Sequence, residues 1–298
     1  MDLLMSKPRL LTIVADDYGI GPETSRGILD LAREGIITAS VVIVNCADTE
    51  RAVAEWKKNP PQADLGWHPN LTLDSPISRP GEVPSLVDSD GKFWKLGVFL
   101  MRICMGQIKY RDVLHEWTAQ YRRFHDLMGH TPPVINSHQH VALFSPVAQA
   151  LFDILRQHKE KPYLRRVVEY LRPISLVPGA RLKRSFLSVL GRRTAQQASR
   201  LGLPGCDQLL GVTDHHCVAD QQFWTKWLGA ISRRGNVEIC CHPGYTDPTL
   251  LHRDCDAGDG LLRRPRETDL LRMPHFRQAV QCAGLKVIRP SQLVATIG

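Results

Sequence analysis

The 298-residue sequence has no long apolar run, no apolar segment at its start and no Cys-X-X-Cys pair. No stretch approaches the roughly 20 apolar residues of a membrane-spanning helix, so we expect no transmembrane segment. The first eight residues lack the apolar core of a signal peptide, and we expect none. Of the eight cysteines, Cys240 and Cys241 are adjacent, which favours a reducing cytoplasm over a disulfide framework.

The composition excludes few classes of protein. Hydrophobic residues make up 43% and charged residues 23% of the chain, as in an ordinary globular enzyme. The formal net charge of +8 favours anionic partners without identifying one. Because the chain has no recognised nucleic-acid-binding motif, we expect no nucleic acid among its partners.

Short apolar runs alternate with amphipathic segments along the whole chain, which indicates β-α-β units and a parallel sheet. The expected strands cover residues 10–14, 40–44, 64–68, 134–137, 164–168, 208–212, 237–241 and 285–288. The expected helices cover residues 24–34, 49–58, 96–106, 111–128, 146–157, 221–232 and 266–282. No repeat or linker divides the chain. We therefore predict an α/β fold in which residues 1–298 form a single, irregular TIM-like (β/α) barrel.

Residues 173–205 differ from the rest because arginine and lysine alternate there with leucine, phenylalanine and valine, and acids are nearly absent. One interpretation is a basic helical insertion that covers one end of the barrel. A second interpretation is that residues 181–200 contact a membrane surface or an anionic, lipid-linked substrate.

Two adjacent carboxylates, Asp16 and Asp17, follow the first apolar run. The carboxyl ends of parallel strands are where α/β folds carry their active sites. Two neighbouring carboxylates repel each other unless a cation or a proton offsets their charge. One hypothesis is a metal-binding aspartate beside a proton-transferring aspartate, and the alternative is a pair of turn or helix-capping residues.

Histidines follow three further strands: His68, His138 with His140, and His242. In a barrel these strand ends meet at one mouth, so we expect the side chains to converge there. His138 and His140 share a face only if their strand continues, and we expect His138 in the site with His140 beside it. Two imidazoles and a carboxylate suit a catalytic divalent metal, such as Zn²⁺ or a harder ion.

Two further groups have residue types that bind metals. In the segment 214–217 the adjacent His215 and His216 should point apart, so we expect a loop near the barrel mouth rather than a second metal site. Asp254, Asp256 and Asp259 lie among glycines, but they lack the spacing and the distal glutamate of an EF-hand.

Three residues near the expected mouth are candidates for contact with substrate. Arg266 precedes an apolar helix, where it either belongs to the helix start or contacts substrate. Tyr245 could stack on a sugar ring, whereas core packing is the better expectation for Trp67.

Four motifs occur together and in order: Ala-Asp-Asp-Tyr-Gly at 15–19, Gly-Trp-His at 66–68, Asn-Ser-His-Gln-His-Val at 136–141 and Cys-His-Pro at 241–243. In this combination the chain resembles the YdjC-like carbohydrate deacetylases. The resemblance runs over nearly the whole chain. It implies an irregular TIM-like barrel, one divalent metal ion (Mg²⁺ or Zn²⁺) and removal of acetyl from an N-acetylated sugar.

The resemblance also implies roles for individual residues. Asp17, His68 and His138 would bind the metal, Asp16 would be the general base and His242 the general acid. Tyr18 and Asn136 depart from the family, in which Phe and Asp are common at these positions. Neither departure removes a ligand.

The basic segment is similar to that of the hopanoid-associated branch of the family, which implies a glycolipid substrate. Barrels of this kind often form homodimers. A hypothesis from another class is a metal-free, non-catalytic sugar-binding barrel.

Overall fold

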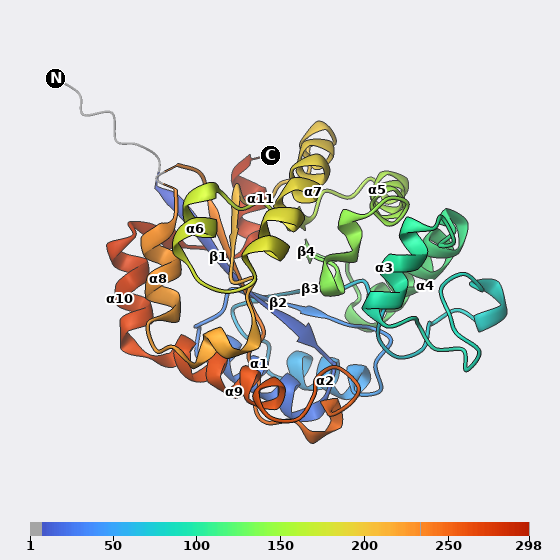
Figure 1. Ribbon diagram of the computed structural model, residues 1–298, viewed down its shortest axis with the longest axis horizontal. Helices are drawn as coiled ribbons and strands as arrows, with labels where there is room; N and C mark the ends of the chain where they lie inside the picture. Colours follow the sequence, from blue (N-terminus) through green and yellow to red (C-terminus); the bar gives the residue numbers. More distant parts are fainter. Residues whose placement is uncertain (1–7, 233, 298) are drawn as a thin grey trace.

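The computed structural model describes residues 8–232 and 234–297. Within that part of the chain, eight parallel strands form one curled sheet in the order β5-β4-β3-β2-β1-β7-β6, and β8 pairs with the first residues of β1 (Figure 1). The strands are β1 (Arg9–Tyr18), β2 (Ala39–Val42), β3 (Asp64–Trp67), β4 (Val134–Ile135), β5 (Tyr163–Leu164), β6 (Gln208–Leu210), β7 (Val237–Cys241) and β8 (Leu285–Val287). The predicted α/β class is confirmed.

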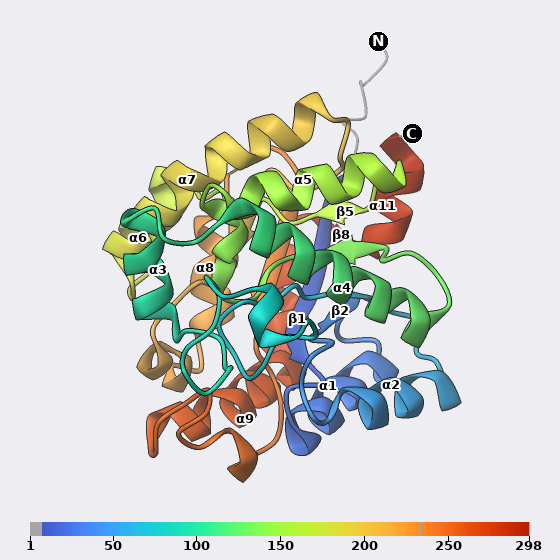
Figure 2. The same cartoon turned by 90° about the vertical axis from the view of Figure 1, so that its right-hand side faces the viewer.

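Helices surround the curled sheet, as Figures 1 and 2 show from two directions. They are α1 (Pro22–Arg33), α2 (Thr49–Lys58), α3 (Leu96–Cys104), α4 (Tyr110–Met128), α5 (Val147–His158), α6 (Leu171–Leu176), α7 (Arg181–Arg200), α8 (Phe223–Ala230), α9 (Asp259–Arg272), α10 (Pro274–Cys282) and α11 (Pro290–Ile297). Among the described helices, none is long and apolar enough to cross a membrane.

The sheet curls like a barrel but does not close as one. Its end strands β5 and β6 are not paired in the described residues, although the amide of Leu209 donates to the carbonyl of Val168 just beyond β5. The predicted barrel is therefore an open, barrel-like sheet.

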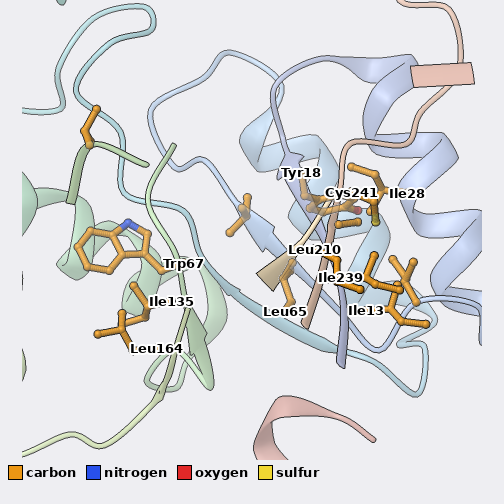
Figure 3. Close-up of a cluster of buried hydrophobic side chains, with 14 of the residues drawn as sticks. Ile13, Tyr18, Ile28, Leu65, Trp67, Ile135, Leu164, Leu210, Ile239 and Cys241 are labelled. Carbon is orange, nitrogen blue, oxygen red and sulfur yellow. The ribbon is translucent and has the colours of Figure 1, made fainter. Parts of the chain in front are cut away.

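Side chains of β1 alternate between two environments. Leu11, Ile13 and Ala15 pack in the main core under the helices, which Figure 3 shows around Ile13. Thr12 faces the inside of the curl, where its hydroxyl lies 3.3 Å from that of Tyr163. This alternation directs Thr12 and Val14 inward, and Asp16 continues the inner row.

Several predicted boundaries are wrong, among them the strand predicted over 164–168, which is Tyr163–Leu164 in the structure. Two others change an element more strongly. The strand predicted over 10–14 continues through Asp16 and Asp17 to Tyr18. The helix predicted over 266–282 is two helices that meet at Met273, whose ψ of 136° is extended. Pro274 explains the break, because a residue before proline avoids the helical region.

The basic segment is helical, and its two helices α6 and α7 connect β5 to β6. They therefore occupy the position of a crossover helix within the β/α order, and the structure gives no mark of an insertion. Arg184 of α7 is buried and pairs with Glu169. The exposed side includes Leu171 and Leu182, which are 79% and 89% exposed.

Candidate active site

A cavity of about 500 Å³ opens at the carboxyl ends of the strands. Its walls carry Asp16 and Asp17 from β1 and histidines that follow β3, β4 and β7. The structure thus brings together the five residues Asp16, Asp17, His68, His138 and His242, which lie up to 226 positions apart in the sequence. Helices α3, α7 and α9 supply half of the remaining wall residues, and loops and 3-10 turns supply the rest.

Asp17, His68 and His138 form a compact, buried group. Asp17 Oδ1 lies 3.0 Å from Nδ1 of His138 and 3.2 Å from Nε2 of His68. The two imidazole rings are 5.4 Å apart and nearly perpendicular. Asp17 Oδ2 instead accepts a hydrogen bond from Arg264 at 2.8 Å. The two oxygens of one carboxylate therefore serve different partners.

The hydrogen bonds of His68 show why this group suits a cation. Its Nδ1 lies 2.7 Å from the carbonyl oxygen of Asn136, which only accepts, so Nδ1 carries a hydrogen. In the neutral ring, Nε2 then presents a lone pair toward the Asp17 carboxylate. Two acceptors at 3.2 Å repel each other unless a proton or a cation lies between them.

The donor set also fits a divalent metal. Burial raises the pKa of Asp17, but the charge of Arg264 and the hydrogen bond from His138 outweigh it and hold the pKa well below its ordinary value. Nε2 of His138 is buried without a partner in the described residues. One anionic oxygen and two imidazoles match the three-ligand sets of catalytic metals.

Asp16 has a different surrounding. Arg165 donates to both of its oxygens, at 2.5 and 2.8 Å, and Asn136 donates to one at 3.2 Å. Burial raises the pKa of Asp16, but the charge of Arg165 outweighs it and lowers the pKa below its ordinary value. The ligand atoms of Asp16, Cys240 and His242 also lie within 4.8 Å of one another. Arg165 donates to both oxygens of Asp16, however, whereas an arginine donates to only one oxygen of Asp17. Asp17 therefore has the carboxylate oxygen better placed for a metal ion.

Arg165 and its second partner Glu238 were not predicted. Arg165 pairs with Glu238 as well as with Asp16, and Glu238 accepts from the hydroxyl of Tyr163 at 2.6 Å. Both residues could have been noticed in the sequence, because each is a charged side chain inside a predicted strand. Arg165 lies in the predicted strand 164–168, and Glu238 lies in the predicted strand 237–241. Arg264 has no comparable signal, because it lies among three other arginines.

His242 lies at the edge of the same cavity. Its Nδ1 accepts from Arg263 at 3.0 Å, so the neutral ring carries its hydrogen on Nε2, which lies 3.8 Å from Asp16 Oδ2. Burial, reinforced by the charge of Arg263, lowers the pKa of His242 well below its ordinary value. Its backbone amide donates to Glu267, which also pairs with Arg263.

The sequence matches a known protein family. Residues 10–282 match the model of the family described as YdjC-like protein. The chain belongs to the YdjC-like family. It is 27% identical to the chitooligosaccharide deacetylase of Klebsiella pneumoniae (strain 342), over 82% of this chain and 84% of that protein. It is 24% identical to the chitooligosaccharide deacetylase of Yersinia enterocolitica, over 94% of this chain and 97% of that protein.

A solved structure shares the fold of this YdjC-like chain. It is a protein of Enterococcus faecalis V583 described as a candidate cellobiose-phosphate cleavage protein. The TM-score is 0.76 at 22% identity, and the match covers 96% of this chain and 99% of the other. The incompletely closed, barrel-like sheet is therefore a fold that this YdjC-like chain shares with a solved protein.

Two predicted substrate contacts lie away from the cavity of this YdjC-like protein. Arg266 is in the middle of α9, where it pairs with Asp259 at 2.8 Å, and it is not part of the cavity wall. Its predicted place at a helix start is wrong, because α9 begins at Asp259. The hydroxyl of Tyr245 donates to Asp30 at 2.8 Å, with Arg26 stacked on its ring, so it too is outside the wall.

The remaining candidates lie in the core or in the cavity wall. Trp67 is fully buried, as expected of a core residue. His140 lines the cavity, but it belongs to a 3-10 turn with a φ of 58° rather than to a continued strand. Burial and Arg165 lower the pKa of His140 to about 3, so it is neutral. Asp254, one of the three aspartates that lie among glycines, pairs with Arg264 at 2.9 Å.

Proposed function

We propose that this YdjC-like protein is a metal-dependent hydrolase that removes acetyl from an N-acetylated amino sugar, of the N-acetylglucosamine oligosaccharide type. The observation that carries the proposal is the pair of aspartates with separate partners. Asp17 lies against two histidines, in an arrangement that favours a bound cation. Beside it, the positive charge of Arg165 keeps Asp16 ionised. The names of the relatives support the substrate class.

Asp17, His68 and His138 would hold one divalent ion, either Zn²⁺ or Mg²⁺. When bound, such an ion lowers the pKa of water and polarises an acyl oxygen. The other steps belong to side chains of this chain. The buried wall around Asp17 excludes bulk water from the reacting acyl group, which strengthens every electrostatic interaction there.

Asp16 would move the proton, with His242 beside it. Asp16 is ionised at neutral pH and would accept a proton from the attacking water as it adds to the acyl carbon. The protonated Asp16 would then pass this proton to the leaving amine nitrogen when the carbon–nitrogen bond breaks, which returns Asp16 to its ionised form. His242 stays neutral and would use its Nε2 hydrogen, 3.8 Å from Asp16, to hold the reacting group by a hydrogen bond.

A lipid-linked amino sugar is the second candidate substrate, and one surface favours it. Large apolar side chains are exposed on α6, α7 and the turn before them: Tyr170, Leu171, Leu176, Leu182, Phe186 and Val189. Phe186 also lines the cavity, so this apolar surface continues into the site. Cations of α7, among them Arg181 and Arg192, lie on the same helix and would attract an anionic membrane.

Acetate release tests both candidates. We expect wild-type protein to release acetate from N-acetylglucosamine oligosaccharides, and release to stop with a chelator and in Asp17→Asn and His138→Ala. Arg266→Gln is the matched control, because Arg266 lies outside the cavity wall. Sugar binding that survives chelation, with no acetate from any substrate, would instead indicate a non-catalytic binding protein.

The same assay separates the two substrate classes. A glycolipid substrate in anionic vesicles would be preferred if the second candidate is right. Leu182→Asp should then reduce release from vesicles and leave release from soluble oligosaccharides unchanged, since Leu182 does not line the cavity. An equal effect on both substrates would contradict membrane docking.

A further inference from the structure

The loop after β6 carries a second group of metal-ligand side chains. Asp214, His216 and Cys217 place one ligand atom each within 4.8 Å of one another. This group lies at the rim of the cavity, where the 3-10 helix His215–Ala219 begins. The sequence led us to expect a loop here without a metal site, and the structure brings the three side chains together.

The adjacent His215 and His216 lie in different surroundings, as their positions in the sequence led us to expect. His215 lines the cavity, whereas His216 belongs to the group with Asp214 and Cys217. The two neighbouring rings therefore point to different places. The group needs only one of them, because Asp214 and Cys217 complete it.

A second observation points to the same spot. Thr213 is 6% exposed, and its hydroxyl oxygen is buried without a partner in the described residues. A Cβ added to Gly179 would lie 2.7 Å from that oxygen and 2.6 Å from Sγ of Cys217. The hydroxyl and the thiol therefore both lie against Gly179, at a place where a Cβ would overlap with them. An unsatisfied buried hydroxyl beside a thiol indicates a missing partner.

The backbone already orients the carboxylate of the group. The amide of Ala180 donates to Asp214 Oδ2 at 2.7 Å, which leaves Oδ1 for another partner. The amide of Cys217 donates to the carbonyl of Asp214 at 3.1 Å, which fixes the spacing between the two residues. Hydrogen bonds of this kind hold metal ligands in place in known sites.

We propose that Asp214, His216 and Cys217 bind a second metal ion of the zinc class. A thiolate, an imidazole and a carboxylate form a borderline-soft donor set, which selects Zn²⁺ over Mg²⁺. Cys217 binds as the thiolate and releases its proton to solvent. The site differs from the Asp17 group, which contains no sulfur, and it does not depend on the proposed deacetylase activity.

Such an ion would fix one part of the cavity rim. All three ligands lie in the segment 214–217, at the start of the 3-10 helix that presents His215 to the cavity. The amide of Ala180 already ties this segment to the α6–α7 connection through Asp214. Metal binding would therefore hold the turn that carries His215 in one conformation.

Titration of the metal-free, fully reduced protein with Co²⁺ tests the proposal, because a cobalt–thiolate bond gives a charge-transfer band in the near ultraviolet. We expect two equivalents of Co²⁺, with the band saturating at one. Cys217→Ser should lose the band and one equivalent, and His216→Ala should weaken that equivalent at least about tenfold. Cys255→Ser is the matched control, because Cys255 is a partly buried cysteine of the rim that is outside the group.

The titration tests this second metal site separately from the metal site proposed at Asp17. One equivalent with the band would support this site and count against a metal at Asp17. One equivalent without the band, or a band that survives Cys217→Ser, would overturn the site. His216 is exposed, so His216→Ala gives an answer if Cys217→Ser does not fold.

Discussion

Arg165→Met tests the buried charge network beneath the cavity. The Arg165 side chain is 1% exposed and neutralises Asp16 and Glu238, which are 3% and 1% exposed. Methionine fills much of the same volume but carries no charge. The variant therefore leaves two carboxylates buried together without their cation, which is the costly way to break a buried ion pair.

We expect the free energy of unfolding at pH 7 to fall by about 3–5 kcal/mol. An exposed ion pair gives the matched control. Lys226 pairs with Asp220 on the surface, where the two side chains are 50% and 37% exposed. Lys226→Met should cost no more than about 1 kcal/mol, because solvent screens the pair.

The pH dependence of the loss follows from the pKa directions. In the wild type, the lowered pKa of Asp16 contributes stability that is present above its unfolded value of about 4 and is lost as pH falls through the folded value. In Arg165→Met, the charge that opposes most of the burial is removed, so the pKa of Asp16 rises above its unfolded value, and the pKa of Glu238, which burial already raises in the wild type, rises further. Protonation then relieves the penalty, and the gap to the wild type should narrow from pH 8 to pH 5.

Urea unfolding followed by tryptophan fluorescence measures this gap, since Trp67, Trp117, Trp224 and Trp227 are buried. A loss below about 1 kcal/mol at pH 7, equal to the Lys226→Met control, would refute the assignment of a buried charge network. A gap that widens on acidification would refute the pKa reasoning even if the loss is large.

Two further predictions concern contacts that position the strands and α1. Gly66→Ala should lower the unfolding free energy by at least about 1–3 kcal/mol, because a Cβ would lie 2.0 Å from the carbonyl oxygen of Val134 on the paired strand β4. Thermal unfolding measures the loss, and Gly97→Ala, with open space around it, should show none. Asp247→Ala should cost about 1 kcal/mol, because Asp247 accepts from two backbone amides in the first turn of α1. Burial raises the pKa of Asp247, but its hydrogen bonds lower it overall, so this cost should shrink in urea titrations below pH 4.

Local patterns predicted the parts of the fold that depend on neighbouring residues. The segment 49–58 was predicted as a helix and is α2, and the segment 237–241 was predicted as a strand and is β7. The break before Pro274 could have been predicted too, since the residue before a proline leaves the helical region. The segments 134–137 and 164–168 were predicted as strands and contain β4 and part of β5, but the short length of both strands could not be predicted, because two residues carry no periodicity.

The candidate site was predictable only in its strand-end residues. Asp16, His68 and His242 follow apolar runs, and parallel strands bring such positions to one edge. The partner of Asp16 could not be assigned in this way, because Arg165 is 149 residues distant. A contact of that range is decided by how far the sheet curls, which no local pattern reports.

The conformation of Asp17 explains how two adjacent carboxylates reach one cavity. Neighbouring side chains of a regular strand point to opposite faces, so Asp17 would turn into the helix layer if β1 were regular. The register between β1 and β2 shifts between Ala15 and Tyr18, and Asp17 has a φ of 70°. A left-handed backbone at a non-glycine residue costs about 1–2 kcal/mol, so favourable contacts must hold it there. Those contacts are the hydrogen bonds from His138 and Arg264. The same backbone turn that strains the strand therefore separates the carboxylate of Asp17 from the carboxylate of Asp16, which Arg165 holds.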